Sequence, residues 1–429
     1  MKNLVAAVFL SVFPVLAYAQ INVPLTGKVG KYTYALGLEE RMRYEYRYNF
    51  DLNPSVKDNG SLFFHRFKIN TQLSNDWMTF FIEGLDAQTG GYQLKAISNQ
   101  TDDFDLHQLY VQLKDIASSH LDVKLGRQEI EYGKGRIIGA PAWNNRMRAF
   151  DASILHWANE GFYADAFYAQ DVKYDDDKFN ASRNEEFVTG LYGGYQHDKK
   201  SPLLETYLMK LVDIKGNNDI NRYTVGARVQ AEVYKGIVAD VEVPFQFGKT
   251  GTQTGGAKTI KAWAFHADLS KAFEDIVWKP KVALAYDQAS GDNDPNDSVS
   301  NTFVPLYQAS HSAYGLLDFV RWQNVRNPEL GITFNPTKKF KFTTMVDFFW
   351  LDSKSDAWYN STGSTVRLKT AGERDYYLGR ELSLRLYYDF NKNVKWENGV
   401  AHFSPGSYAA DSGANHEAFW VYSQLSIKY

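Results

Sequence analysis

Alternation of apolar and polar residues is the dominant pattern along this chain. From Leu36 to Tyr48 the sequence LGLEERMRYEYRY places leucine, methionine and tyrosine on one face of an extended strand, and glutamate and arginine on the other. The segments 63–73 (FFHRFKINTQL) and 419–429 (FWVYSQLSIKY) repeat this pattern. The chain is therefore predicted to be all-β, with strands that carry one apolar and one polar face.

The connections between these segments differ in length. Short turns are expected at 74–77, 158–161, 198–202, 335–339 and 391–393, and long polar loops at 51–60, 88–103, 171–186, 288–320 and 353–374. A soluble β-sandwich also alternates, but short turns at one end and long loops at the other are typical of an outer-membrane barrel. We expect a transmembrane antiparallel β-barrel of about 18 strands, with short periplasmic turns and long extracellular loops. The strands should begin near residues 35, 62, 77, 105, 121, 149, 162, 187, 203, 220, 236, 258, 277, 326, 339, 376, 394 and 417.

The N-terminal segment has the composition of a secretory signal peptide. It combines Lys2, an apolar run from Leu4 to Leu16, and the cleavage pattern Ala17-Tyr18-Ala19. A transmembrane helix is the alternative, but the run is shorter than the ~20 residues that a helix needs to span a bilayer, and it contains Pro14. We predict a signal peptide at 1–19 and a single outer-membrane barrel domain at 20–429.

Composition and charge narrow the possible functions. With 44% hydrophobic and 15% aromatic residues the chain can bury a large core, and a net charge of -3 indicates no nucleic-acid partner. The absence of cysteine excludes disulfides and thiolate chemistry. No H-x-x-x-H or H-E-x-x-H spacing and no G-x-S-x-G motif is present, so we expect no metal, no cofactor and no catalysis.

The polar faces of the strands should line the interior of the barrel. In lipid every backbone N–H and C=O needs an internal partner, so the sheet must close and turn its apolar face outward. With ~18 strands the lumen is too wide for side chains to fill, which predicts a water-filled channel unless loops enter it. The wall residues expected to line this pore are Glu39, Arg41, Arg43, Glu45, Arg47, Arg66, Lys68, Glu83, Glu381 and Arg385.

One strand does not fit the alternation. If Leu121, Val123 and Leu125 face lipid, Arg127 lies on the lipid side as well. Either a β-bulge intervenes, or Arg127 lies above the membrane.

The stretch from Leu125 to Trp157 combines strand-like ends with a turn-rich, basic middle. Its core, LGRQEIEYGKGRIIGAPAWNNRMRAFDA, resembles the outer-membrane alginate-export family, in which a strand ending in GRQ leads through a YG-x-GR-x-IG turn to a WNN…R-x-FD segment. Two further stretches, TFVPLYQASHSAYGLLDFVRWQN (302–324) and YLGRELSLRLYYDF (377–390), are also similar to that family.

The resemblance implies a monomeric barrel, surrounded by outer-membrane lipid, whose arginine- and lysine-lined lumen conducts an anionic polysaccharide or organic acid by diffusion. Arginine suits this role because it offers bidentate donors to carboxylates, and glutamates on the same face would keep the arginines apart. The stretch around residue 140 is expected to fold inward and bring Arg136, Arg146 and Arg148 toward the lumen. An ordinary solvated extracellular loop is the alternative.

Other functions remain open at this point. Because no periplasmic turn is long enough to form a lid, passive exchange or uptake is favoured over dedicated secretion. A general porin, a loop-closed surface receptor and, less favourably, an outer-membrane enzyme are the alternatives.

Overall fold

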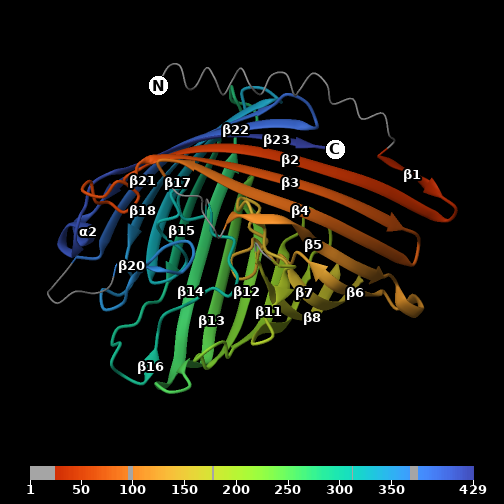
Figure 1. The fold of residues 1–429 in the computed structure, drawn as a ribbon, viewed down its shortest axis with the longest axis horizontal. Helices are drawn as coiled ribbons and strands as arrows, with labels where there is room; N and C mark the ends of the chain where they lie inside the picture. The colour runs from red at the N-terminus through yellow and green to blue at the C-terminus, as the bar shows by residue number, and fades with distance from the viewer. Residues whose placement is uncertain (1–24, 95–99, 176–177, 312, 368–374) are drawn as a thin grey trace.

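The wall of the molecule is a single closed sheet. The computed structural model describes residues 25–94, 100–175, 178–311, 313–367 and 375–429; the expected signal peptide at 1–19 lies outside them. Within these ranges eighteen antiparallel strands form a ring, which closes where β2 pairs with both β3 and β23. Figure 1 shows the wall running from red β2 through green β14 to blue β23, which returns to β2.

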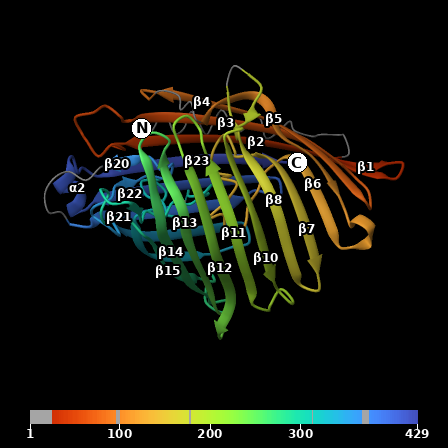
Figure 2. The same ribbon diagram turned by 90° about the horizontal axis from the view of Figure 1, so that it is seen from below.

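The wall strands have the following bounds: β2 Tyr32–Tyr48, β3 Gly60–Ser74, β4 Met78–Tyr92, β5 Asp102–Leu113, β6 Leu121–Gln128, β7 Phe150–Asn159, β8 Phe162–Lys173, β10 Glu186–Tyr195, β11 Leu203–Asp213, β12 Ile220–Tyr234, β13 Ile237–Thr252, β14 Gly256–Ala272, β15 Lys281–Ala289, β17 Val325–Phe334, β18 Phe340–Trp350, β21 Tyr377–Asp389, β22 Val394–Pro405 and β23 Ala418–Lys428. Figure 2 shows β10 to β14 lying next to one another in chain order. The predicted strand starts are confirmed; the largest difference is at β15, expected near residue 277 and beginning at Lys281.

The remaining elements are short. They are β1 Thr26–Val29, β9 Ala181–Ser182, β16 Val299–Ser300, β19 Trp358–Tyr359, β20 Thr365–Arg367, a 3-10 turn at Ile116–Ser118 and helix α2 Ser407–Ser412. β1 forms a hairpin with the start of β2, at the end of the barrel where β23 stops. No helix in the described residues is long and apolar enough to cross a membrane.

The distribution of polarity is the reverse of that in a soluble protein. On β2 the charged residues Arg41, Arg43 and Glu45 are buried, whereas Tyr46 and Tyr48 are exposed. Exposed leucine, valine and phenylalanine side chains recur on the outer face around the barrel. This arrangement is expected only if the outer face contacts lipid.

Arg127 stays on the outer face of its strand. The pairing of β6 with β5 and with β7 proceeds without a register shift, so no bulge turns this side chain inward. Instead Arg127 lies one residue from the end of β6, where its Nε donates a 2.8 Å hydrogen bond to Asp151 and its Nη1 donates to the Leu106 carbonyl. The ion pair neutralises the arginine at the extracellular end of the strand.

A depth-dependent cost is expected for charge on the outer face. Leu208, in the middle of β11, and Leu204, near its periplasmic end, are 43% and 47% exposed. Leu208→Arg should lower the free energy of unfolding by about 2–4 kcal/mol, and the matched control Leu204→Arg by about 0–1 kcal/mol. Denaturant unfolding in lipid vesicles measures both values, and equal losses would contradict the assignment of this face to lipid.

Candidate functional site

The segment 129–149, here called the first inward loop, lies inside the barrel. Arginines on the inner face of β2 and β3 hold it by its backbone. Arg41 Nη1 donates to the Ala142 carbonyl at 2.8 Å, Arg43 Nη1 to the Trp143 carbonyl at 2.8 Å, and Arg66 Nη1 to the Ala142 and Asn144 carbonyls, both at 3.0 Å. The inward position expected from the sequence is therefore the one observed, and the solvated loop is not.

Residues 301–324, without residue 312, form a second inward loop that pairs with the first. The Gly139 N–H donates to the Tyr307 carbonyl at 2.9 Å, and the Tyr307 N–H donates to the Ile137 carbonyl at 2.8 Å. The rings of Trp143 and His311 stack at 4.1 Å and 9°. Two segments that lie far apart in the sequence thus form one bridge across the lumen.

The second inward loop is also tied to the wall. The carboxylate of Glu381 accepts hydrogen bonds from the backbone N–H groups of Leu316 and Leu317. Gly315 precedes them with a φ of +79°, and a side chain at this position would overlap the carboxylate of Glu381. A glycine here lets the loop turn and approach the wall closely.

The predicted inner-face residues of β2, β3 and β4 are neighbours, but most of them are engaged with one another or with the loops. Arg43 is 2% exposed, pairs with Glu45 at 2.8 Å and lies 3.8 Å from the Trp143 ring. Arg47 is the most exposed of this group and also binds Glu45. Glu39 pairs with Arg66 and with Lys428. These side chains do not form an open row of charges, because most of them are engaged in ion pairs with one another or in hydrogen bonds to the first inward loop.

The three arginines of the first inward loop lie inside the barrel but at separate places. Arg136 reaches the opposite wall, where its Nη1 lies 3.0 Å from Glu242; burial opposes its charge, but the surrounding carboxylates outweigh burial and raise the pKa of its guanidinium. Arg146 lies over the ring of Tyr174, 4.3 Å from its centre. Arg148 donates to the carbonyls of Gly139 and Tyr307.

A polar cluster at the start of the first inward loop has the composition of a metal site. Ligand atoms of Glu83, His107 and Glu129 lie within 4.8 Å of one another. The ammonium of Lys68, however, lies 3.0 Å from Glu83 and 3.8 Å from Glu129, so it already supplies the positive charge. Burial raises the pKa of Glu129, but the hydrogen bond from His107 and the charge of Lys68 outweigh burial and lower it. The contact between Lys68 on the wall and Glu129 at the start of the loop anchors the loop to the wall.

Two adjoining cavities lie between the bridge and the end of the barrel with the short turns. The inner one, of about 410 Å³, lies against the two inward loops, and its charged lining comes from Glu39, Arg41, Arg66, Arg385, Glu397 and Lys428. The outer one, of about 540 Å³, lies at the end of the barrel with the short turns, next to residues 335–339. The cavities share Tyr387, Glu397, Gln424, Ser426 and Lys428.

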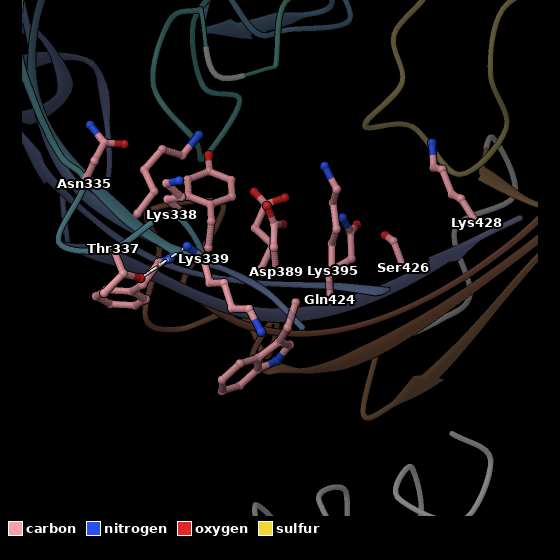
Figure 3. A pocket seen from close by; sticks show the side chains of 14 residues that line it. Asn335, Thr337, Lys338, Lys339, Asp389, Lys395, Gln424, Ser426 and Lys428 are labelled. Atoms are coloured by element: carbon pink, nitrogen blue, oxygen red, sulfur yellow. Dashed lines mark hydrogen bonds between the residues drawn. The ribbon is translucent and has the colours of Figure 1, made fainter. Parts of the chain in front are cut away.

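The outer cavity is rich in lysine. Figure 3 shows Lys395 and Lys428 projecting with Asp389 from the strands into the same open space. None of these lysines was predicted to line the pore, although Lys428 stands on the polar face of its strand. The alternation of the last strands already places lysines close to the short turns, and this pattern could have indicated a cationic lining there. The lysines of the lining are Lys338, Lys339, Lys341, Lys395 and Lys428.

Comparison with known proteins fits this geometry. A family model described as alginate export matches residues 32–421. The chain belongs to the alginate-export family. The match covers nearly all of the barrel, as the sequence resemblance did. A member of this family with this fold is an outer-membrane channel. No curated protein matches the chain.

Solved structures similar to this family member include one described as an outer membrane protein, OpdK. They include Pseudomonas aeruginosa OpdK (TM-score 0.64, 10% identity, 92% of this chain and 98% of that chain) and P. aeruginosa OccK2 in complex with glucuronate (0.62, 14%, 92% and 97%). Acinetobacter baumannii OccAB3 is similar at a TM-score of 0.62, with 12% identity over 92% of this chain and 99% of that chain. At these identities the likeness concerns the fold.

The position of the first inward loop should depend on Arg43. Arg43→Gln removes the hydrogen bond to Trp143 and the ion pair with Glu45, which should lower the free energy of unfolding by about 1.5–3 kcal/mol and make the single-channel current larger and noisier. The matched control is Arg47→Gln, which loses a bond to the same glutamate at a more exposed position. Planar-bilayer recordings compare the two, and an unchanged current in Arg43→Gln would show that this arginine does not hold the loop.

Proposed function

We propose that this channel lets anionic saccharides of the uronate type, or organic acids, diffuse across the outer membrane. The observation that carries the proposal is the excess of cationic side chains around the two adjoining cavities. Eight cationic residues line them, against three carboxylates, although the whole chain has a net charge of -3. The cations are the five lysines of the outer cavity with Arg41, Arg66 and Arg385; the carboxylates are Glu39, Asp389 and Glu397.

Such a lining favours carboxylates for a physical reason. A carboxylate that leaves bulk water needs a counter-charge, which the lysines supply as mobile point charges. Arg41 and Arg66 contribute positive charge, although their guanidinium groups already donate to the first inward loop. Conduction also requires release, and several weak sites in series satisfy this better than one strong site. Glu397, shared by both cavities, limits the local excess of positive charge.

The similar structures support this class of solute. P. aeruginosa OccK2 has been solved in complex with glucuronate, a sugar that carries one carboxylate. An outer cavity of about 540 Å³ is large enough for a solute of this size.

Passive diffusion is the mode of transport that we propose, with no catalytic step. The two turns nearest the outer cavity, 335–339 and 390–393, are too short to form a lid over it. We propose that the barrel acts as a monomer surrounded by outer-membrane lipid; each chain closes its own sheet, so its backbone needs no strand from a partner chain.

Removing the lysines should reduce anion preference. The triple variant Lys341→Gln, Lys395→Gln, Lys428→Gln should shift the reversal potential in a salt gradient toward that of a non-selective pore, because the outer cavity loses three of its five positive charges. Planar-bilayer recordings measure the shift.

A matched control removes the same charge at the same end of the barrel. Lys199, Lys200 and Lys235 are exposed in short turns and do not line either cavity. Their triple glutamine variant should leave the reversal potential unchanged. Equal shifts in both triple variants, or no shift in the first, would refute a selective role of the cavity lysines.

A further inference from the structure

A short segment of the second inward loop is surrounded by arginines from three parts of the chain. Arg222 of β12 donates to the Val304 carbonyl at 3.4 Å, Arg321 of the same loop donates to the Pro305 carbonyl at 3.2 Å, and Arg148 donates to the Tyr307 carbonyl at 2.7 Å. Since the three carbonyls lie within four consecutive residues, the three guanidinium groups lie close together. Arg222 stands near the extracellular end of its strand, so this cluster is separate from the lysine-lined cavity.

The charges in this cluster are not balanced by the described part of the protein. Arg148 has Asp171 at 3.8 Å, but neither Arg222 nor Arg321 makes an ion pair with any residue whose placement is described. They are only 6% and 8% exposed, and the Nε of each lacks a hydrogen-bond partner there. Burial, together with repulsion from Arg148 and Arg222, lowers the pKa of Arg321 to about 10, which leaves it charged at neutral pH.

Among the described residues, three of the four other buried arginines have a carboxylate partner. Arg228 pairs with Glu205 and Asp240, both at 2.5 Å, and Arg43 pairs with Glu45. Arg41 makes no direct ion pair with a described residue and its Nε also lacks a hydrogen-bond partner there, but the charges of Glu39 and Glu45 act on it. A buried guanidinium without a negative partner is costly, and the usual solution is a carboxylate or a bound anion.

We propose that Arg222 and Arg321 form a binding site for a small oxyanion of the carboxylate or phosphate type. The planar fork of each guanidinium suits two oxygen atoms of such an anion. The anion neutralises both charges and stabilises the segment Val304–Tyr307 in its inward position. This inference does not depend on the identity of the transported solute.

The test is the thermal unfolding of the refolded barrel in detergent at increasing inorganic phosphate. A ligand that binds the folded state raises the midpoint temperature in a saturable manner. The midpoint of the unmodified chain should rise and saturate, whereas the double variant Arg222→Gln, Arg321→Gln should lose this saturable rise. Without phosphate the double variant should unfold at the same temperature as the unmodified chain or at a higher one, because an uncompensated charge pair has been removed.

A control separates this effect from the general stabilisation of proteins by phosphate. Arg326 and Arg380 are exposed, and the double variant Arg326→Gln, Arg380→Gln removes the same charge outside the cluster. It should keep the saturable rise. If the first double variant does not fold, Arg321→Lys replaces it: the charge remains but the fork is lost, and saturation should require a several-fold higher phosphate concentration.

Acetate and glucuronate, titrated in the same way, identify the source of the anion. A saturable rise with phosphate and acetate would support a free small anion, and a rise with glucuronate alone would support the carboxylate of a passing sugar acid. The proposal fails if no anion gives a saturable rise, or if the rise is the same in the Arg222→Gln, Arg321→Gln variant. The reversal potential of the lysine variants is measured independently, so failure here leaves the proposed solute class untouched.

Discussion

The structure depends on one constraint: every backbone hydrogen-bonding group in the hydrocarbon layer must find a partner within the protein. The sheet meets it by closing, with β2 paired to β3 on one side and to β23 on the other. Closure gives each strand one face toward lipid and one toward the lumen, which is why the sequence alternates with a period of two. It also creates an interior that wall side chains cannot fill.

Two inward loops occupy part of the interior that closure of the sheet creates. Two loops enter the lumen, pair with each other through Gly139 and Tyr307, and are held by arginines that donate to their carbonyls. Arginine suits this task because one guanidinium reaches a carboxylate on the wall and a carbonyl on the loop at once, as Arg43 does with Glu45 and Trp143. Arginine and lysine thus have different places here: Arg41, Arg43 and Arg66 hold the first inward loop, whereas five lysines line the cavity next to the short turns.

The sequence was sufficient for the fold because the pattern that predicts it is local. The period of two, the lengths of the connections and the requirement of closure predicted eighteen strands and their starts closely. The faces of β2 were predicted correctly for the same reason, since Arg41 and Tyr46 stand at opposite parities. Arg127 shows the limit of this reasoning. Its position in the alternation predicted that it lies on the outer face, but not that it pairs with Asp151 on the next strand.

The site could be predicted only in part. Alternation indicated that Arg41, Arg43 and Arg66 face inward, but not that residues 142–144 would cover them, since these contacts join residues 76 to 101 positions apart. The cavity lysines lie in or next to short turns. Too few strand residues separate them from the turn for the alternation to show which way they face. Their convergence depends on the side-by-side pairing of β18, β21, β22 and β23, which a linear sequence does not display.

Current block by oligouronates, measured against neutral oligosaccharides of equal length on the same single channel, tests the central claim most directly. Oligouronates should interrupt the current in a concentration-dependent manner, and neutral oligosaccharides of the same length should do so far less. Equal block by both would contradict it, because the cationic lining would then contribute nothing to the choice of solute.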